Sequence, residues 1–93
     1  MAYIVERYLP GLDREELLRS LERLKLVTAE LRREGTPVHY LGSTIVLEDE
    51  ACFCQFEGPS EAAVVEVNRR AGLSFDRIVG AVAVPRPPQQ EQQ

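Results

Sequence analysis

The sequence is poor in the residue types on which most metal and catalytic sites depend. Its 93 residues include two cysteines, one histidine, one methionine and no tryptophan. A closed zinc site of the finger type needs four Cys or His ligands, which this composition does not supply. The chain also has no glycine-rich phosphate loop and no nucleophile elbow. These absences favour a protein that is not an enzyme, although a lone histidine can act as a general base.

Excess positive charge and long apolar runs are missing too. There are 11 Lys and Arg residues against 15 Asp and Glu, which gives a net charge of −4. Nucleic-acid binding depends on clustered basic residues, so we expect no nucleic-acid partner. The N-terminal stretch "MAYIVERYLP" has neither the basic region of a signal peptide nor the length of a membrane span. We therefore expect a cytoplasmic protein that is not attached to membranes and keeps its thiols reduced.

What is present is the composition of one small globular domain. The hydrophobic fraction is 44% and the charged fraction 28%, both typical of folded proteins. We assign residues 1–85 to this domain and predict that the Pro- and Gln-rich residues 86–93 form a disordered or extended tail.

β-Branched and aromatic residues predict four strands. They occupy residues 2–9, 38–47, 51–56 and 76–84, and the second and third form a hairpin across the acidic turn 48–50. Because one helix is predicted after the first strand and one after the third, the order is βαββαβ. This order is typical of ferredoxin-like folds, an α+β class in which two helices cover one face of a four-stranded antiparallel sheet.

The two helices have clear ends in the sequence. Asp13 and Glu16 form a carboxylate version of the capping box, and Gly35 is expected to end the first helix. Ser60 is expected to cap the second helix, which should end at Gly72. Apolar stripes at helical spacing are predicted to face the core, and they comprise Leu17, Leu21, Leu24, Thr28 and Leu31, then Ala63, Val64, Val67 and Ala71.

Three stretches of the sequence resemble a known family. "YIVERYLPG", "CQFEGPSEAAV" and "RRAGLSFDRIV" are similar to segments of a family of small bacterial ferredoxin-like proteins of unknown function that includes a nickel-binding protein. The resemblance implies a homodimer and, in at least some members, binding of nickel or another divalent transition metal. The family often has a tryptophan in its second strand, where this chain has "VHYLG". A second subunit would also cover the sheet face that the helices leave open.

The two cysteines lie in the third strand, one residue apart. Alternate strand residues are about 6.6 Å apart, whereas a disulfide needs Cβ atoms about 3.5 to 4.5 Å apart. Cys52 and Cys54 should therefore not bridge each other. We expect buried residues on the helix side of the sheet, with a role as metal ligands as the weaker alternative.

The neighbours of the cysteines should lie on the open face. With a three-residue turn, Ile45 pairs with Phe53, and His39 lies on the same face as Glu57. This register also places Leu41, Ser43 and Gln55 on the open face. A bulge at Gly42 or a longer turn would move His39.

Glu6 in the first strand is expected to join His39 and Glu57 on this face. Imidazole and carboxylate together suit nickel, zinc or copper, so these three residues are the predicted metal ligands. Two alternatives remain: His39 as an exposed or interface histidine, and Glu6 in an ion pair across the sheet.

Three functional hypotheses follow from these residues. The first is a homodimeric, non-enzymatic protein that binds a divalent transition metal. The alternative is a small-molecule-binding protein or small enzyme, oxygenase- or isomerase-like, of the dimeric α+β barrel type, which requires an enclosed apolar pocket of about 300 Å³ or more. The third is an interaction module that uses the Pro-rich tail as a peptide ligand.

Overall fold

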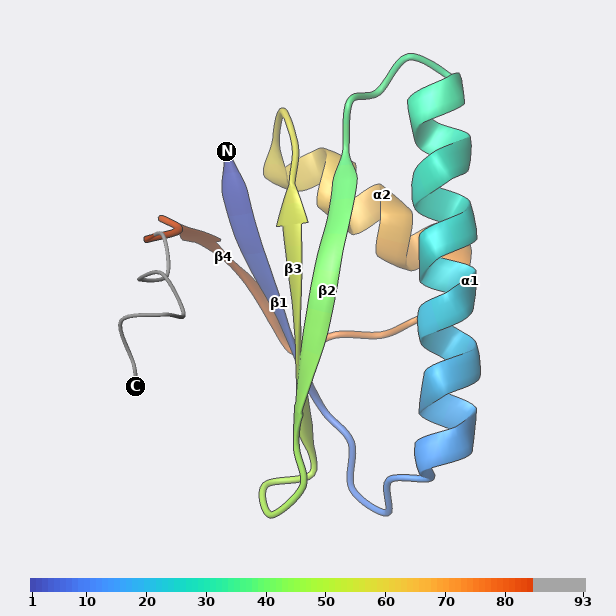
Figure 1. The fold of residues 1–93 in the computed structure, drawn as a ribbon, viewed down its shortest axis with the longest axis vertical. Coiled ribbons are helices and arrows are strands. Elements are labelled where there is room, and N and C mark those ends of the chain that lie inside the picture. Colours follow the sequence, from blue (N-terminus) through green and yellow to red (C-terminus); the bar gives the residue numbers. More distant parts are fainter. Residues whose placement is uncertain (85–93) are drawn as a thin grey trace, which may run out of the picture.

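Four strands form one antiparallel sheet in the computed structural model of the chain, which describes residues 1–84 (Figure 1). The strands are β1 (Ala2–Tyr8), β2 (His39–Val46), β3 (Ala51–Glu57) and β4 (Arg77–Ala81), in the spatial order β2-β3-β1-β4. This topology confirms the predicted ferredoxin-like fold. The predicted tail, residues 86–93, lies outside the described residues.

Both helices lie on one side of the sheet (Figure 1). The longer one, α1 (Arg14–Arg33), begins where the Asp13 carboxylate accepts hydrogen bonds from the backbone N–H groups of Glu15 and Glu16. The shorter one, α2 (Glu61–Ala71), is capped by the Ser60 hydroxyl and ends at a left-handed Gly72 with φ 71°. The predicted N-caps Asp13 and Ser60 are therefore confirmed, and each helix ends at a glycine with positive φ, Gly35 after the C-cap Glu34 and Gly72. No helix within residues 1–84 has the length and apolar character needed to cross a membrane.

The core lies between the helices and the covered face of the sheet. The predicted stripe of α1 is buried over its whole length, as is that of α2. The sheet contributes an alternating set of buried residues, Tyr3, Val5, Cys52, Cys54 and Phe56. Cys52 and Cys54 are fully buried, as predicted. Opposite them, the open face carries Ile4, Phe53 and Val79, which are half-buried although no described element packs over them.

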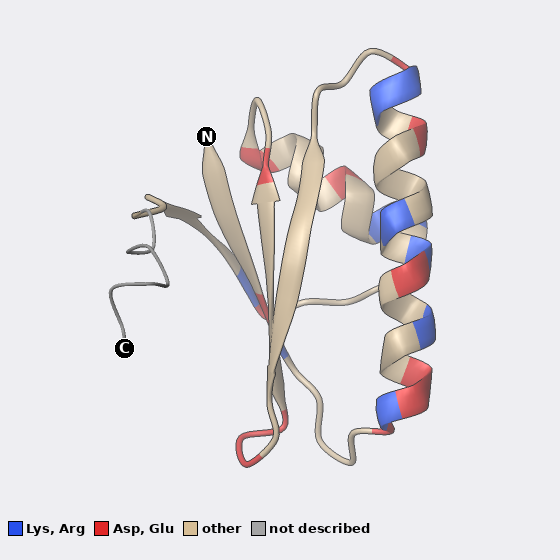
Figure 2. Cartoon of the chain, in the orientation of Figure 1, with Lys and Arg blue, Asp and Glu red and all other residues tan. Residues whose placement is uncertain are grey.

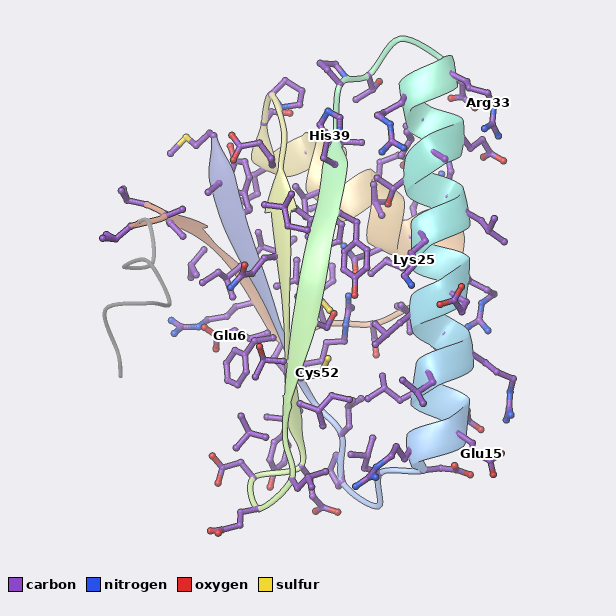
Figure 3. All side chains as sticks on the ribbon, in the orientation of Figure 1. Glu6, Glu15, Lys25, Arg33, His39 and Cys52 are labelled. Carbon is purple, nitrogen blue, oxygen red and sulfur yellow. The ribbon has the colours of Figure 1, made fainter. Side chains whose placement is uncertain are left out.

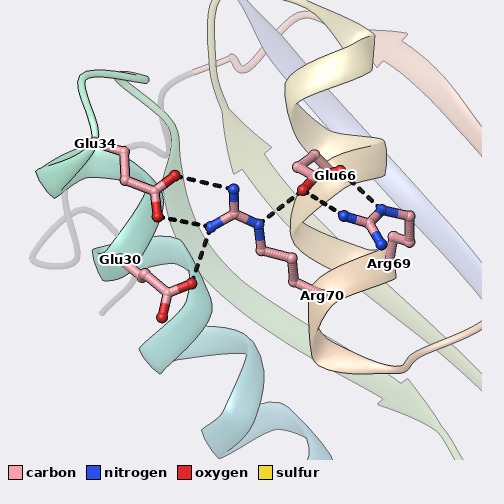
Figure 4. A network of polar contacts seen from close by, with 5 residues as sticks. All are labelled: Glu30, Glu34, Glu66, Arg69 and Arg70. Atoms are coloured by element: carbon pink, nitrogen blue, oxygen red, sulfur yellow. Dashed lines mark hydrogen bonds and ion pairs between the residues drawn. The ribbon is translucent and has the colours of Figure 1, made fainter.

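Charge is concentrated away from the sheet (Figure 2). Acidic and basic side chains alternate along α1, and the β2–β3 turn is acidic. Between the helices, Arg70 of α2 contacts Glu30 of α1 and Glu34, the C-cap of α1, with Nη1 2.9 Å from Glu30 Oε1 and 2.9 Å from Glu34 Oε2 (Figure 4). Its Nε lies 2.7 Å from Glu66 Oε2, and Glu66 also pairs with Arg69. This network joins the ends of the two helices.

The register of the β2–β3 hairpin differs from the prediction at two places. The turn contains four residues rather than three, because Val46 pairs with Ala51. Ile45 consequently pairs with Cys52, and its predicted pairing with Phe53 is wrong.

The second difference is a bulge between Tyr40 and Gly42, which the glycine had indicated. Gly42 adopts φ 137°, a conformation that only glycine adopts readily. Each one-residue shift alone would reverse the face of His39, but the two together restore it. Ser43 lies between the two shifts, so its predicted place on the open face is wrong: it is paired with Cys54 on the helix side.

Candidate metal site and buried thiol cluster

His39 lies directly opposite Glu57 at the corner where β2 begins and β3 ends. Directly opposed residues of an antiparallel pair have Cβ atoms about 4.5 to 5.5 Å apart, so an imidazole and a carboxylate can meet there. Both residues are exposed. Glu57 Oε1 lies 2.7 Å from the amino group of Met1, which is itself exposed. A metal ion bound to the Glu57 carboxylate would take the place of the exposed Met1 ammonium group, which is also a cation.

Glu6 does not join this pair within one chain. It lies opposite Phe53, four residues along β3 from Glu57, which is a separation of about 13 Å. Figure 3 shows Glu6 and His39 at different levels of the sheet. The Glu6 carboxylate instead forms an ion pair with Arg77 of β4, at 2.9 Å. Across residues 1–84, no three His, Cys, Asp or Glu side chains lie close enough together to hold a metal ion.

A second group of polar residues lies in the core, centred on Arg7 of β1. Its side chain is only 2% exposed. Nη1 donates to the backbone oxygen of Ser74 at 2.9 Å, and Nη2 donates to Asn68 Oδ1 at 2.5 Å. Nη2 also lies 3.6 Å from Cys54 Sγ, while Nε has no partner. None of the carboxylates within residues 1–84 pairs with this guanidinium.

Both thiols lie beside Arg7. The Sγ atoms of Cys52 and Cys54 are 3.8 Å apart and not bonded, which agrees with the predicted absence of a disulfide. The Ser43 hydroxyl donates to Cys54 Sγ at 2.9 Å, and it shares a further hydrogen bond with the Tyr40 hydroxyl. These interactions, first that with the Cys52 thiol and then those with Ser43 and Arg7, lower the pKa of Cys54 to about 6. The contact with Cys54, together with burial, raises the pKa of Cys52.

A groove of about 530 Å³ runs between α1 and β2, next to the thiols. Its sides are largely apolar, with charged residues at the rim, and they comprise Leu18, Arg19, Leu21, Glu22, Lys25, Tyr40, Gly42, Ser43 and Ile45. The groove is open to solvent on one side, unlike the enclosed pocket that the small-molecule hypothesis requires. Ser43 is shared between the groove and the thiol cluster.

The fold and this corner define a class: a small ferredoxin-like protein whose open face presents histidine and carboxylate donors. The chain belongs to the family described as "Nickel responsive protein SCO4226-like", which matches residues 3–80. It is similar to the crystal structure of SCO4226 from Streptomyces coelicolor A3(2), with a TM-score of 0.76 and 21% identity. The alignment covers 91% of this chain and 100% of that one. No curated protein matches the sequence.

The sequence did not lead us to expect a buried Arg7, although one signal was present. Arg7 continues the alternation of Tyr3 and Val5, which places all three side chains on the covered face. A buried arginine is rare, and its partners Asn68 and Ser74 are more than 60 residues away in sequence. Residue spacing alone could not predict these contacts.

Proposed function

We propose that this protein binds a divalent transition-metal ion, nickel by its family, with His39 and Glu57 as ligands. The observation that carries the proposal is the direct cross-strand pairing of these two residues. Imidazole is a good ligand for nickel, and a neighbouring carboxylate offsets part of the charge of the ion. The description of the family as nickel responsive supports this metal over others. No enzymatic step is part of the proposal.

We propose in addition that the protein is a homodimer that packs through its open sheet face. The half-buried Ile4, Phe53 and Val79 would be covered there, which would add buried apolar area to the small core of this chain. Two ligands from one chain leave coordination positions for water or for a second copy. Glu6 stays a predicted ligand only if the Glu6 of a second copy of the chain reaches the ion that His39 and Glu57 bind. The cytoplasmic location also stays a prediction.

Titration calorimetry of the metal-free protein with Ni²⁺ and Zn²⁺ tests the proposed site. We expect nickel binding tighter than roughly millimolar, weakened at least about tenfold by His39→Ala and by Glu57→Gln. Glu61→Gln is the matched control, because it removes an exposed carboxylate four positions after Glu57 in the sequence, at the start of α2, and should leave binding unchanged. Absence of binding, or equal binding by wild type and His39→Ala, would contradict the proposal.

A further inference from the structure

The sulfur of Cys54 is the one contact of the buried Arg7, within residues 1–84, that can become negatively charged. The guanidinium donates to two neutral oxygens, those of Ser74 and Asn68, and its Nη2 atom lies 3.6 Å from Cys54 Sγ. A buried charge without a counter-charge is costly, and an ionised Cys54 supplies the counter-charge of Arg7. The two residues are therefore arranged as a buried guanidinium–thiolate pair.

Hydrogen-bond donors surround Cys54 Sγ. The Cys52 thiol lies 3.8 Å away, the Ser43 hydroxyl donates at 2.9 Å, and Arg7 provides the third contact. Behind Ser43 lies the Tyr40 hydroxyl, whose pKa is raised by burial, so it is neutral at pH 7. These donors, first Cys52 and then Ser43 and Arg7, hold the pKa of Cys54 at about 6 although burial opposes ionisation. Because the thiolate is the nucleophilic form of cysteine, Cys54 is the reactive sulfur of the two at pH 7.

We propose that Cys54 is an oxidation site, at which hydrogen peroxide or a similarly small hydroperoxide converts the thiolate to a sulfenic acid. The sulfur attacks one peroxide oxygen, so an S–O bond forms while the O–O bond breaks. The sulfur gives two electrons to the peroxide. The transferred OH group completes the sulfenic acid, and the other oxygen leaves as hydroxide, which takes a proton from water.

The oxidation should stop at the sulfenic acid because the nearest thiol cannot form a disulfide with it. Cys52 and Cys54 are alternate residues of β3, about 6.6 Å apart, whereas a disulfide needs Cβ atoms about 3.5 to 4.5 Å apart. At both positions β3 is paired with β1 on one side and with β2 on the other. A disulfide would therefore have to break the centre of the sheet.

The groove between α1 and β2 provides the route for the peroxide. Ser43 lines that groove and donates to Cys54 Sγ, so a single hydroxyl separates the groove from the sulfur. β2 is an edge strand, paired on one side only, and its bulge next to Gly42 interrupts that pairing. Hydrogen peroxide is hardly larger than water, so a small local opening of β2 is enough to admit it.

Two single-cysteine variants test the proposal, since each retains one buried thiol of the same strand. Reduced Cys52→Ser and Cys54→Ser are treated with hydrogen peroxide at pH 7, quenched with catalase, and unfolded in excess dimedone. Dimedone labels sulfenic acids and leaves the sulfoxide of the exposed Met1 unlabelled. Mass spectrometry should show labelling of Cys52→Ser, whose serine hydroxyl can still donate to Cys54. Labelling of Cys54→Ser should be at least about tenfold slower.

Equal rates in the two variants would mean that global unfolding exposes both thiols, and they would overturn the proposal. So would an absence of labelling in both. In the folded wild type, a disulfide between Cys52 and Cys54 as the main product would refute the predicted end point.

The part played by Arg7 has a separate test. Arg7→Met should slow the labelling about tenfold, because it removes the charge that stabilises the thiolate, and Arg7→Lys, which retains a charge, should slow it less. Circular dichroism checks that both variants are folded, and an unchanged rate in folded Arg7→Met would refute this role. The ultraviolet absorbance of the thiolate in wild type does not depend on these variants. We expect it at pH 7 and not in Cys54→Ser, and a fully protonated Cys54 at pH 7 would overturn the proposal.

Discussion

Arg7 of β1 and Asn68 of α2 are joined by a 2.5 Å hydrogen bond between Nη2 and Oδ1, across 61 positions of sequence. The Asn68 amide also donates to the Val64 oxygen at 2.7 Å, so the side chain is fixed at both ends. Because both residues are buried, the guanidinium loses a partner that water cannot replace if Asn68 is removed.

Asn68→Ala is therefore expected to lower the free energy of unfolding by about 2–3 kcal/mol. Urea denaturation measures this loss. Asn68→Asp retains an oxygen acceptor and adds a negative charge beside Arg7, so it should be less damaging at neutral pH. Equal losses in the two variants would show that the contact with Arg7 does not matter.

The ion network between the helices predicts unequal roles for two adjacent arginines. Arg70 bridges α1 and α2 through Glu30, Glu34 and Glu66, whereas Arg69 pairs only with Glu66 on its own helix. We expect Arg70→Met to lower the thermal midpoint more than Arg69→Met. The difference should shrink in 1 M salt, where exposed charges are screened. Equal thermal midpoints of the two variants at low salt would show that the ion pairs of Arg70 do not hold the two helices together.

The same network predicts a dependence of stability on pH. Hydrogen bonds from Arg69 and then from Arg70 lower the pKa of Glu66 to about 2. A carboxyl group with a lowered folded-state pKa stabilises the fold above its unfolded value, and this contribution disappears as the pH falls through the folded value. Wild type should be more stable than Glu66→Gln at pH 7, and the two should converge between about pH 4.5 and pH 2. Chemical denaturation across this range measures the convergence, and a constant difference would refute it.

The bulge in β2 connects stability to the proposed nickel site. A Cβ atom added at Gly42 would meet no atom within 4 Å, so the φ of 137° is the main cost of a substitution there. We expect Gly42→Val to destabilise the protein by about 1–3 kcal/mol and to weaken nickel binding. Calorimetry measures both effects. Gly80→Ala is the control, because Gly80 lies in the edge strand β4 without a positive φ. If Gly42→Val is destabilised but binds nickel as tightly as wild type, the bulge does not affect the proposed nickel site.

The proposed dimer is tested by a charge on the open face. Phe53 lies at the centre of this face on β3. A lysine there would stay in contact with water in a monomer, whereas a second subunit packed on this face would bury its charge at a high cost. Light scattering should report a dimer for wild type and a monomer for Phe53→Lys at micromolar concentration. Thr44→Lys, on the neighbouring edge strand, is the milder comparison. A wild type that is already monomeric would refute the dimer.

The helices could be predicted well because their signals are local. Asp13 and Ser60 cap backbone groups two or three residues away, and the stripe residues follow the helical period. The hairpin was harder. Its turn length and its bulge each shift the register by one residue, and neither is fixed by residue types alone. His39 reaches the predicted face because the two shifts cancel, whereas Ser43, between them, does not.

The surroundings of the cysteines could be predicted only in part. Strand alternation places Cys52 and Cys54 on the covered face, but the role of Arg7 depends on contacts between β1, β3 and α2. Contacts of this kind depend on how separate elements pack, and a single sequence contains no signal for them. For the same reason, an ion pair of Glu6 across the sheet remained one of two alternatives, and its partner, Arg77, could be identified only once β4 was placed beside β1.

The strand order also determines when the thiols become covered during synthesis. β3 is flanked by β2, made just before it, and by β1, made at the very start of the chain. Asn68 and Ser74, which hold Arg7 in place, are made after these three strands. Until they emerge from the ribosome, the sheet face that carries Cys52 and Cys54 lacks the cover that α2 provides. The order of synthesis therefore makes the burial of the two thiols a late step, which depends on α2 packing onto the sheet.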